Sequence, residues 1–135
     1  MRVLAALISA GRLIFGVAFI AQPTLMDRAW IGKQARLPGA QVLARAVGAR
    51  DLTLGLGGLQ AAARADGSAR PWLAAAAVCD AVDFGATAAA GRRIPRQPRV
   101  GVLAIAGVFS LLSAIAAVGN GADREAVPSA PVVGA

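Results

Sequence analysis

The 135-residue chain has no histidine, no tyrosine and a single cysteine, Cys79. Without histidine there is no imidazole for a histidine zinc site, for haem ligation or for Ser-His-Asp catalysis. One cysteine forms no intramolecular disulfide, and one thiol makes no metal site. We therefore assign no catalytic residue, no metal site and no cofactor to the chain, and we do not expect an enzyme.

Charged residues are also scarce, at 16%, whereas hydrophobic residues make up 57% of the chain. A soluble domain averages about 25% charged and about 45–50% apolar residues. The excess here consists of alanine, valine, leucine and glycine, since aromatic residues make up only 4%. Low charge combined with long apolar runs is typical of an integral membrane protein of one domain.

The charge that is present is mostly positive, with a net value of +7. A basic chain often binds nucleic acid. Here the basic residues lie in short connections between apolar runs, and no basic face is interleaved with aromatic residues that stack on bases. We expect no nucleic-acid partner. The expected partners are the lipid bilayer and either further copies of the chain or a larger membrane complex.

Four apolar segments are each long enough to cross the ~30 Å hydrocarbon core of a bilayer. They cover about residues 3–21, 41–63, 71–91 and 100–119. We predict an all-α fold, a bundle of four transmembrane helices over residues 1–119. The low-complexity tail at 120–135 is predicted to have no fixed structure.

Four spans place both termini on one side of the membrane, and connections 22–40 and 91–99 on the other. These two connections carry seven basic residues, Arg28, Lys33, Arg36, Arg92, Arg93, Arg96 and Arg99. The termini and the middle connection carry four, Arg2, Arg64, Arg70 and Arg124. The positive-inside rule therefore places the two basic connections in the cytoplasm and both termini outside, in a multi-pass protein of the cytoplasmic membrane.

Six ionisable residues fall inside the predicted spans. They are Arg12, Arg45, Arg50, Asp51, Asp80 and Asp83. A charge that faces lipid at mid-span costs about 2.5–3.5 kcal/mol. We therefore expect these side chains to point inward and to form a buried Arg/Asp charge network, neutral as a set.

The spacing of these residues suggests how they pair. Asp80 and Asp83 are three residues apart and share one helical face, so Arg12 and Arg50 are their predicted partners, in an order that the sequence leaves open. Arg45 lies nearer the end of its span, from which a long side chain reaches the membrane surface on the side of the basic connections.

Two readings of the charge network stay open. Arginine suits static, bidentate pairing, which favours a structural role in which the charges fix helix contacts and register. Ionisable groups inside a membrane also mark ion and ligand pathways. We expect an accessory or structural membrane component; the alternative is a small-solute or proton conduit built on Asp80 and Asp83. A membrane enzyme is less favoured, because arginines already neutralise the aspartates that a metal ion would need.

Three stretches carry a resemblance to a known group. They are LARAVGARDLTLGLGGL at 43–59, GRLIFGVAFIAQP at 11–23 and CDAVDFGATAAAGRRIP at 79–95. Together they resemble small actinobacterial four-helix membrane proteins of unknown function, distantly DoxX-like. The Gly-Ala-Arg-Asp run at 48–51 is the most specific element. The resemblance implies four membrane helices over about residues 9–118 and carries over no activity and no site residue.

Overall fold

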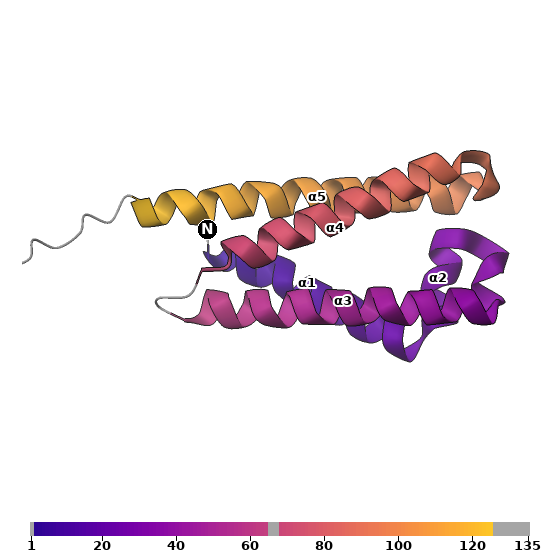
Figure 1. Cartoon of the computed structure of the whole chain (residues 1–135), viewed down its shortest axis with the longest axis horizontal. Helices are drawn as coiled ribbons and strands as arrows, with labels where there is room; N and C mark the ends of the chain where they lie inside the picture. Colours follow the sequence, from indigo (N-terminus) through magenta and orange to yellow (C-terminus); the bar gives the residue numbers. More distant parts are fainter. Residues whose placement is uncertain (1, 65–67, 126–135) are drawn as a thin grey trace, which may run out of the picture.

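The computed structural model describes residues 2–64 and 68–125, with the side chains of 121–125 left out. All regular secondary structure in these residues is helical, which confirms the all-α part of the predicted fold (Figure 1). The elements are α1 (Arg2–Ala21), α2 (Pro23–Ile31), η1 (Gly32–Arg36), α3 (Pro38–Ala63), α4 (Arg70–Ala90), η2 (Gly91–Arg93) and α5 (Arg96–Glu125).

Proline and glycine set the helix boundaries. Proline lies in the first turn of α2, α3 and α4, where its missing N–H is not needed and its fixed φ suits a helix. Gly32 follows α2 and Gly91 follows α4, with φ values of 70° and 55°. Residues with a Cβ rarely adopt a positive φ, so glycine is suited to end these two helices.

Two segments differ from the sequence-based boundaries. The connection predicted at 22–40 contains the regular helix α2 and the 3₁₀ turn η1. Helix α5 continues to Glu125, beyond the predicted start of the tail at 120, while residues 126–135 lie outside the described part of the chain. Pro98 does not stop α5, because it lies in the first turn of that helix.

The helices form two antiparallel pairs, α1 with α3 and α4 with α5 (Figure 1). Glycine lets α1 and α3 approach closely. A methyl group added at Gly16 would lie 2.6 Å from the backbone nitrogen of Leu52, and one at Gly55 would lie 2.7 Å from the carbonyl oxygen of Ser9. Small residues at such crossings allow backbone contact between membrane helices.

The two pairs meet at the end of the molecule that carries the N-terminus, the α3–α4 connection and the later turns of α5 (Figure 1). A cluster of small apolar residues fills the space between them there. This packed cluster consists of Ala5, Ile8, Ala61, Ala69, Leu73, Ala116 and Ala117. At the opposite end, α2 lies between the two pairs, and they are further apart (Figure 1).

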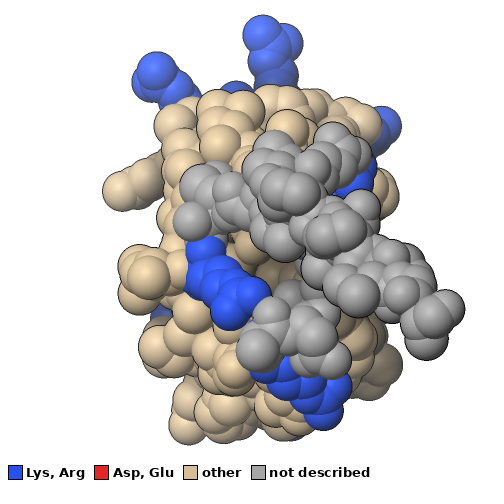
Figure 2. All heavy atoms as spheres, turned by 90° about the vertical axis from the view of Figure 1, so that its left-hand side faces the viewer, with Lys and Arg blue, Asp and Glu red and all other residues tan. Residues whose placement is uncertain are grey.

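The exposed surface of this protein is more apolar than that of a soluble domain, and its core contains charged side chains as well as apolar ones. Large apolar side chains such as Val3, Ile14 and Val78 are more than 60% exposed, while Arg12 and Asp80 are buried. Figure 2 shows the end with the packed cluster, where basic side chains stand out from a largely uncharged surface and the uncovered part shows no acidic side chain. The exposed apolar side chains are suited to lipid, whereas the basic side chains at this end are suited to water.

Three helices are long and apolar enough to cross a membrane. They are α1, the segment Arg70–Arg93 and the segment Arg96–Asn120. Helix α3 has 26 residues, yet it falls outside this class by composition, since Arg45, Arg50 and Asp51 lie within it. Length and composition therefore support three of the four predicted spans.

Candidate functional site

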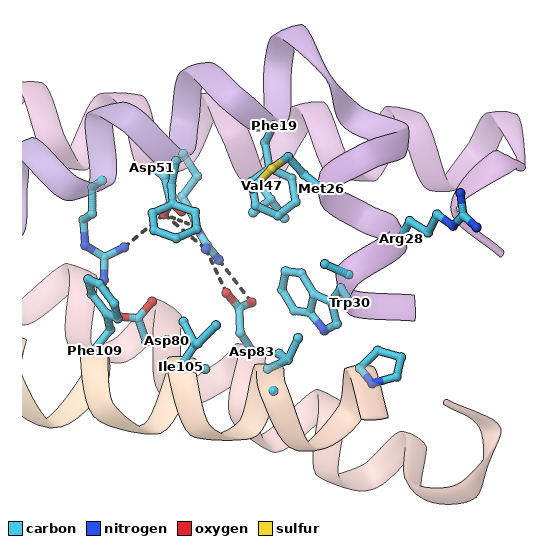
Figure 3. A pocket seen from close by; sticks show the side chains of 18 of the residues that line it. Phe19, Met26, Arg28, Trp30, Val47, Asp51, Asp80, Asp83, Ile105 and Phe109 are labelled. Carbon is cyan, nitrogen blue, oxygen red and sulfur yellow. Dashed lines mark hydrogen bonds and ion pairs between the residues drawn. The ribbon is translucent and has the colours of Figure 1, made fainter. Parts of the chain in front are cut away.

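Five charged residues meet between the two helix pairs, about midway along them. Arg12 comes from α1, Arg50 and Asp51 from α3, and Asp80 and Asp83 from α4. They alternate in sign in the order Asp80–Arg12–Asp51–Arg50–Asp83, and we refer to them as the ion-pair chain (Figure 3). The ion-pair chain is the main polar link between the α1–α3 pair and α4.

Arg12 is the most buried member, with 4% of its surface exposed. One terminal nitrogen, Nη1, donates to Asp51 Oδ1 at 3.0 Å. The other, Nη2, donates to Asp80 Oδ2 and to the carbonyl oxygen of Ala76 at 3.4 Å. One guanidinium therefore connects α1, α3 and α4, which its planar set of donors suits.

Arg50 belongs to the more exposed half of the ion-pair chain. Its Nη1 and Nη2 donate to the two carboxylate oxygens of Asp83 at 3.2 and 2.8 Å, a bidentate pair. Its Nε and Nη2 also donate to Asp51 Oδ1 at 3.3 and 3.2 Å. The Arg50 side chain is 27% exposed, compared with 5% for the Arg12 side chain. The ion-pair chain therefore has a dry end at Arg12 and Asp80 and a wetter end at Arg50 and Asp83.

The ion-pair chain is not neutral. Two arginines face three aspartates, which leaves one negative charge. The sequence-based balance of three cations and three anions included Arg45, which is exposed on α3 and takes no part in the ion pairs of the described residues. Its position near the α2 end of α3 agrees with a side chain that reaches toward the basic connections.

A cavity of about 590 Å³ lies against the ion-pair chain, on the side of the molecule where α2 lies (Figure 3). We call this cavity the chamber. All five members of the ion-pair chain contribute to its lining, and the remaining walls are mostly apolar. The other lining residues are Phe15, Phe19, Met26, Arg28, Ala29, Trp30, Val47, Gln97, Pro98, Gly101, Val102, Ile105, Ala106 and Phe109.

Aromatic side chains hold the walls of the chamber together. Phe15 on α1 and Phe109 on α5 meet edge to face, with ring centroids 6.2 Å apart. Phe19 on α1 meets Trp30 on α2 in the same way at 6.3 Å. Both distances lie in the range preferred by T-shaped aromatic pairs, so the rings stabilise the α1–α5 and α1–α2 contacts.

Trp30 also connects α2 to α4. Its indole nitrogen donates to the hydroxyl oxygen of Thr87 at 3.0 Å. The Thr87 hydroxyl in turn donates to the carbonyl oxygen of Asp83 at 2.7 Å. Helix α2 is therefore fixed across the open end of the helix pairs, and its indole forms part of the chamber wall (Figure 3).

Two buried polar atoms have no hydrogen-bond partner within the described residues, Arg12 Nε and Ser113 Oγ. A buried donor without a partner costs about 1–3 kcal/mol. Arg12 lines the chamber, but its Nε is shielded from the chamber as well as from solvent.

Asp27, on α2, is a third buried aspartate beside Asp51 and Asp80, but it does not line the chamber. Burial raises the pKa of its carboxyl above the ordinary value of 3.8, because removal from water disfavours the charged form. Asp27 therefore differs from the aspartates of the ion-pair chain, each of which forms an ion pair with at least one arginine.

Searches with the chain find no matching protein-family model, no matching curated protein and no matching solved structure. The resemblance to small actinobacterial membrane proteins therefore stays a prediction. In the described residues, no group of three or more acidic or cysteine side chains is arranged to hold a metal ion.

The structure brings together five of the six residues that the sequence singled out, and leaves Arg45 outside. It also resolves the pairing, in which Arg12 binds Asp80 and Arg50 binds Asp83. The sequence did not reveal the aromatic wall. The sequence did contain a signal for helix α2, which carries Trp30 of that wall. Pro23 followed by apolar residues at helical spacing up to Trp30 is typical of a short helix.

Proposed function

We propose that the protein is an integral membrane protein with four spans, in which α3 is the fourth. A helix of 26 residues is about 39 Å long, enough for a ~30 Å hydrocarbon core. The charges of α3 that would be costly at mid-span, Arg50 and Asp51, take part in the ion-pair chain. Its outer surface exposes Val42, Leu43 and Leu56, which are suited to lipid.

The proposed orientation places α2, η1 and η2 at the cytoplasmic side and the packed cluster at the outer side, because the two basic connections are cytoplasmic under the positive-inside rule. Single cysteines test the topology. In a Cys79→Ser background, Leu37→Cys and Arg64→Cys mark the two ends of α3. A membrane-impermeant thiol reagent should label position 64 in intact spheroplasts and position 37 in inverted vesicles. Labelling of both from one side would contradict a fourth span.

We further propose that the chamber binds a small amphipathic molecule within the membrane. Its volume of about 590 Å³ falls inside the range of roughly 300–1,000 Å³ typical of small-molecule sites. Mostly apolar walls with a few convergent polar groups are the usual composition of such sites. The observation that carries the proposal is that all five residues of the ion-pair chain line the chamber, so charged groups border a cavity whose other walls are mostly apolar.

The chamber supports a binding site that is reached from one side. It occupies the half of the molecule near α2, and the packed cluster fills the other half. An open conduit would need a polar path through that cluster, whose members are alanine, leucine and isoleucine. We therefore favour binding over continuous conduction for this conformation.

A structural role is a second candidate for the same residues. The ion-pair chain joins α1 and α3 to α4, and Arg50 binds Asp83 in the static bidentate geometry that arginine favours. In this case the protein would act as an accessory component, and a stoichiometric partner would remain bound during purification in mild detergent.

A set of probes of matched shape tests the chamber. Tetraphenylphosphonium is a cation, tetraphenylborate an anion, and triphenylphosphine oxide a neutral relative. We expect saturable binding of at least one probe to the protein in nanodiscs of zwitterionic lipid, above the level in empty nanodiscs. Ala106→Trp, which places a large ring in the chamber, should weaken that binding strongly.

The matched control is Ala104→Trp, an exposed position two residues away on the same helix that does not line the chamber. It should bind the probe as the unchanged protein does. If no probe binds, or if Ala106→Trp binds as well as Ala104→Trp, the chamber is not a ligand site.

A further inference from the structure

We infer that the ligand of the chamber is a hydrophobic organic monocation; this inference rests on the proposed binding function. The ion-pair chain carries two arginines and three aspartates, and all five residues line the chamber. A single positive charge on a ligand would make the buried set neutral.

The unbalanced charge is costly because it is largely buried. The side chains of Asp51, Asp80 and Asp83 are 12%, 10% and 17% exposed. In such surroundings, water screens charge poorly, and a net charge inside a membrane protein is neutralised by a partner or by water. The two arginines are already shared among the three carboxylates, so a positive group on a molecule bound in the chamber would supply the remaining compensation.

Arg28 also lines the chamber, but it does not provide that compensation. It is exposed on α2, outside the described ion pairs, and solvent screens its charge. An anionic ligand would increase the excess negative charge and would not neutralise it. It would add a second unbalanced negative charge beside Asp51, since both arginines already bind two aspartates each.

The chamber walls suit a cation with apolar substituents. Four aromatic side chains line the chamber, Phe15, Phe19, Trp30 and Phe109. The faces of aromatic rings attract cations, and tryptophan does so most strongly. Apolar substituents on the cation would fill the rest of the chamber, where aliphatic side chains such as Val102 and Ile105 form the wall. A small hydrated inorganic ion would leave these walls without contact.

Probe selectivity tests the sign of the charge. We expect saturable binding of tetraphenylphosphonium to the full chain in zwitterionic nanodiscs, and at least about tenfold weaker saturable binding of tetraphenylborate and triphenylphosphine oxide. Preference for the anion, or equal affinity for all three, would overturn the inference while leaving the chamber as a binding site. Failure of all three probes would overturn both proposals.

Asp51→Asn tests the source of the selectivity. It leaves the two pairs Arg12–Asp80 and Arg50–Asp83 balanced, and the asparagine oxygen still accepts hydrogen bonds from both arginines. Affinity for tetraphenylphosphonium should fall by about tenfold, with the thermal midpoint and the elution volume close to those of the unchanged protein. Asp83→Asn, at the wetter end of the ion-pair chain, also leaves two arginines with two aspartates. It should lower the affinity for tetraphenylphosphonium by the same factor.

The matched control is Asp27→Asn, which removes a buried aspartate that does not line the chamber. Binding should stay unchanged. If Asp51→Asn and Asp83→Asn both fold and keep the affinity of the unchanged protein for tetraphenylphosphonium, the excess charge does not select the ligand. If Asp27→Asn weakens binding as much as they do, the effect is not specific to the ion-pair chain. Either result would overturn the inference.

Discussion

The two ends of the molecule are built differently from the same long helices, α1, α3, α4 and α5. At one end small apolar residues bring the two pairs into contact, with Ala5 and Ala116 fully buried. At the other end the pairs diverge around the chamber, and contact is made by ion pairs, aromatic edges and α2. The ion-pair chain lies between the two regions. Side-chain size and charge, rather than hydropathy, therefore determine where the two helix pairs pack together and where they enclose the chamber.

Removal of Arg12 should have the largest effect, because Arg12 holds three helices together at the boundary between these ends. Arg12→Ala leaves Asp80 buried without its arginine, and it leaves the ion-pair chain with one arginine for three aspartates. Loss of one partner of a buried pair costs about 3–5 kcal/mol. We expect a much lower thermal midpoint in detergent, measured by circular dichroism, and reduced expression.

Arg45→Ala is the control for this substitution, since Arg45 is an exposed arginine on a neighbouring helix, and it should change the midpoint little. A double replacement, Arg12→Met with Asp80→Leu, removes both members of the dry pair and should recover much of the lost stability. If Arg12→Ala is as stable as Arg45→Ala, the ion-pair chain does not hold the helix pairs together.

The same substitution at two positions of α5 compares the two ends directly. Ala116→Leu adds three carbon atoms to the packed cluster, which has no space for them, and should lower stability by about 1–3 kcal/mol. Ala106→Leu adds the same atoms to the wall of the chamber, where empty space accepts them, and should be close to neutral. Chemical denaturation of both variants measures the difference. Equal losses would mean that the chamber is closed in the folded protein.

The smallest expected effect concerns Asp27 on α2, at the end of the molecule that contains the chamber. The stability of the protein should depend on pH through this residue. Because burial raises its folded pKa above 3.8, the folded protein holds this proton more tightly than the unfolded chain does. The resulting stability is present at low pH and is lost as the pH rises from about the unfolded pKa through the raised folded pKa. In Asp27→Asn this decline should be absent, so the difference in thermal midpoint between the two proteins should change across that interval. A constant difference would show that Asp27 titrates normally.

The sequence predicted the features that depend on local composition. Helical structure follows from apolar runs bounded by proline and glycine, and the grouping of Arg12, Arg50 and Asp80 follows from the cost of a charge facing lipid. That energetic argument applies wherever a charge lies at mid-span, so it needed no knowledge of how the helices pack.

Features that depend on the exact path of the backbone were not predictable. The structure shows which face of α3 meets α4: Arg50 lies on that face, and Arg45, about 140° around the helix from Arg50, faces outward. The chamber needs α2 to fold back between the helix pairs, which depends on the Trp30–Thr87 hydrogen bond across 57 residues of sequence. Hydropathy carries no information on either point.

The position of Trp30 gives the protein an optical reporter. Its indole lines the chamber, contacts Phe19 and donates to Thr87, so a molecule that enters changes the polarity around the ring. The second tryptophan, Trp72, lies away from the chamber beside Gly57. In a Trp72→Phe background, the emission wavelength of the remaining indole follows the filling of the chamber without any attached dye.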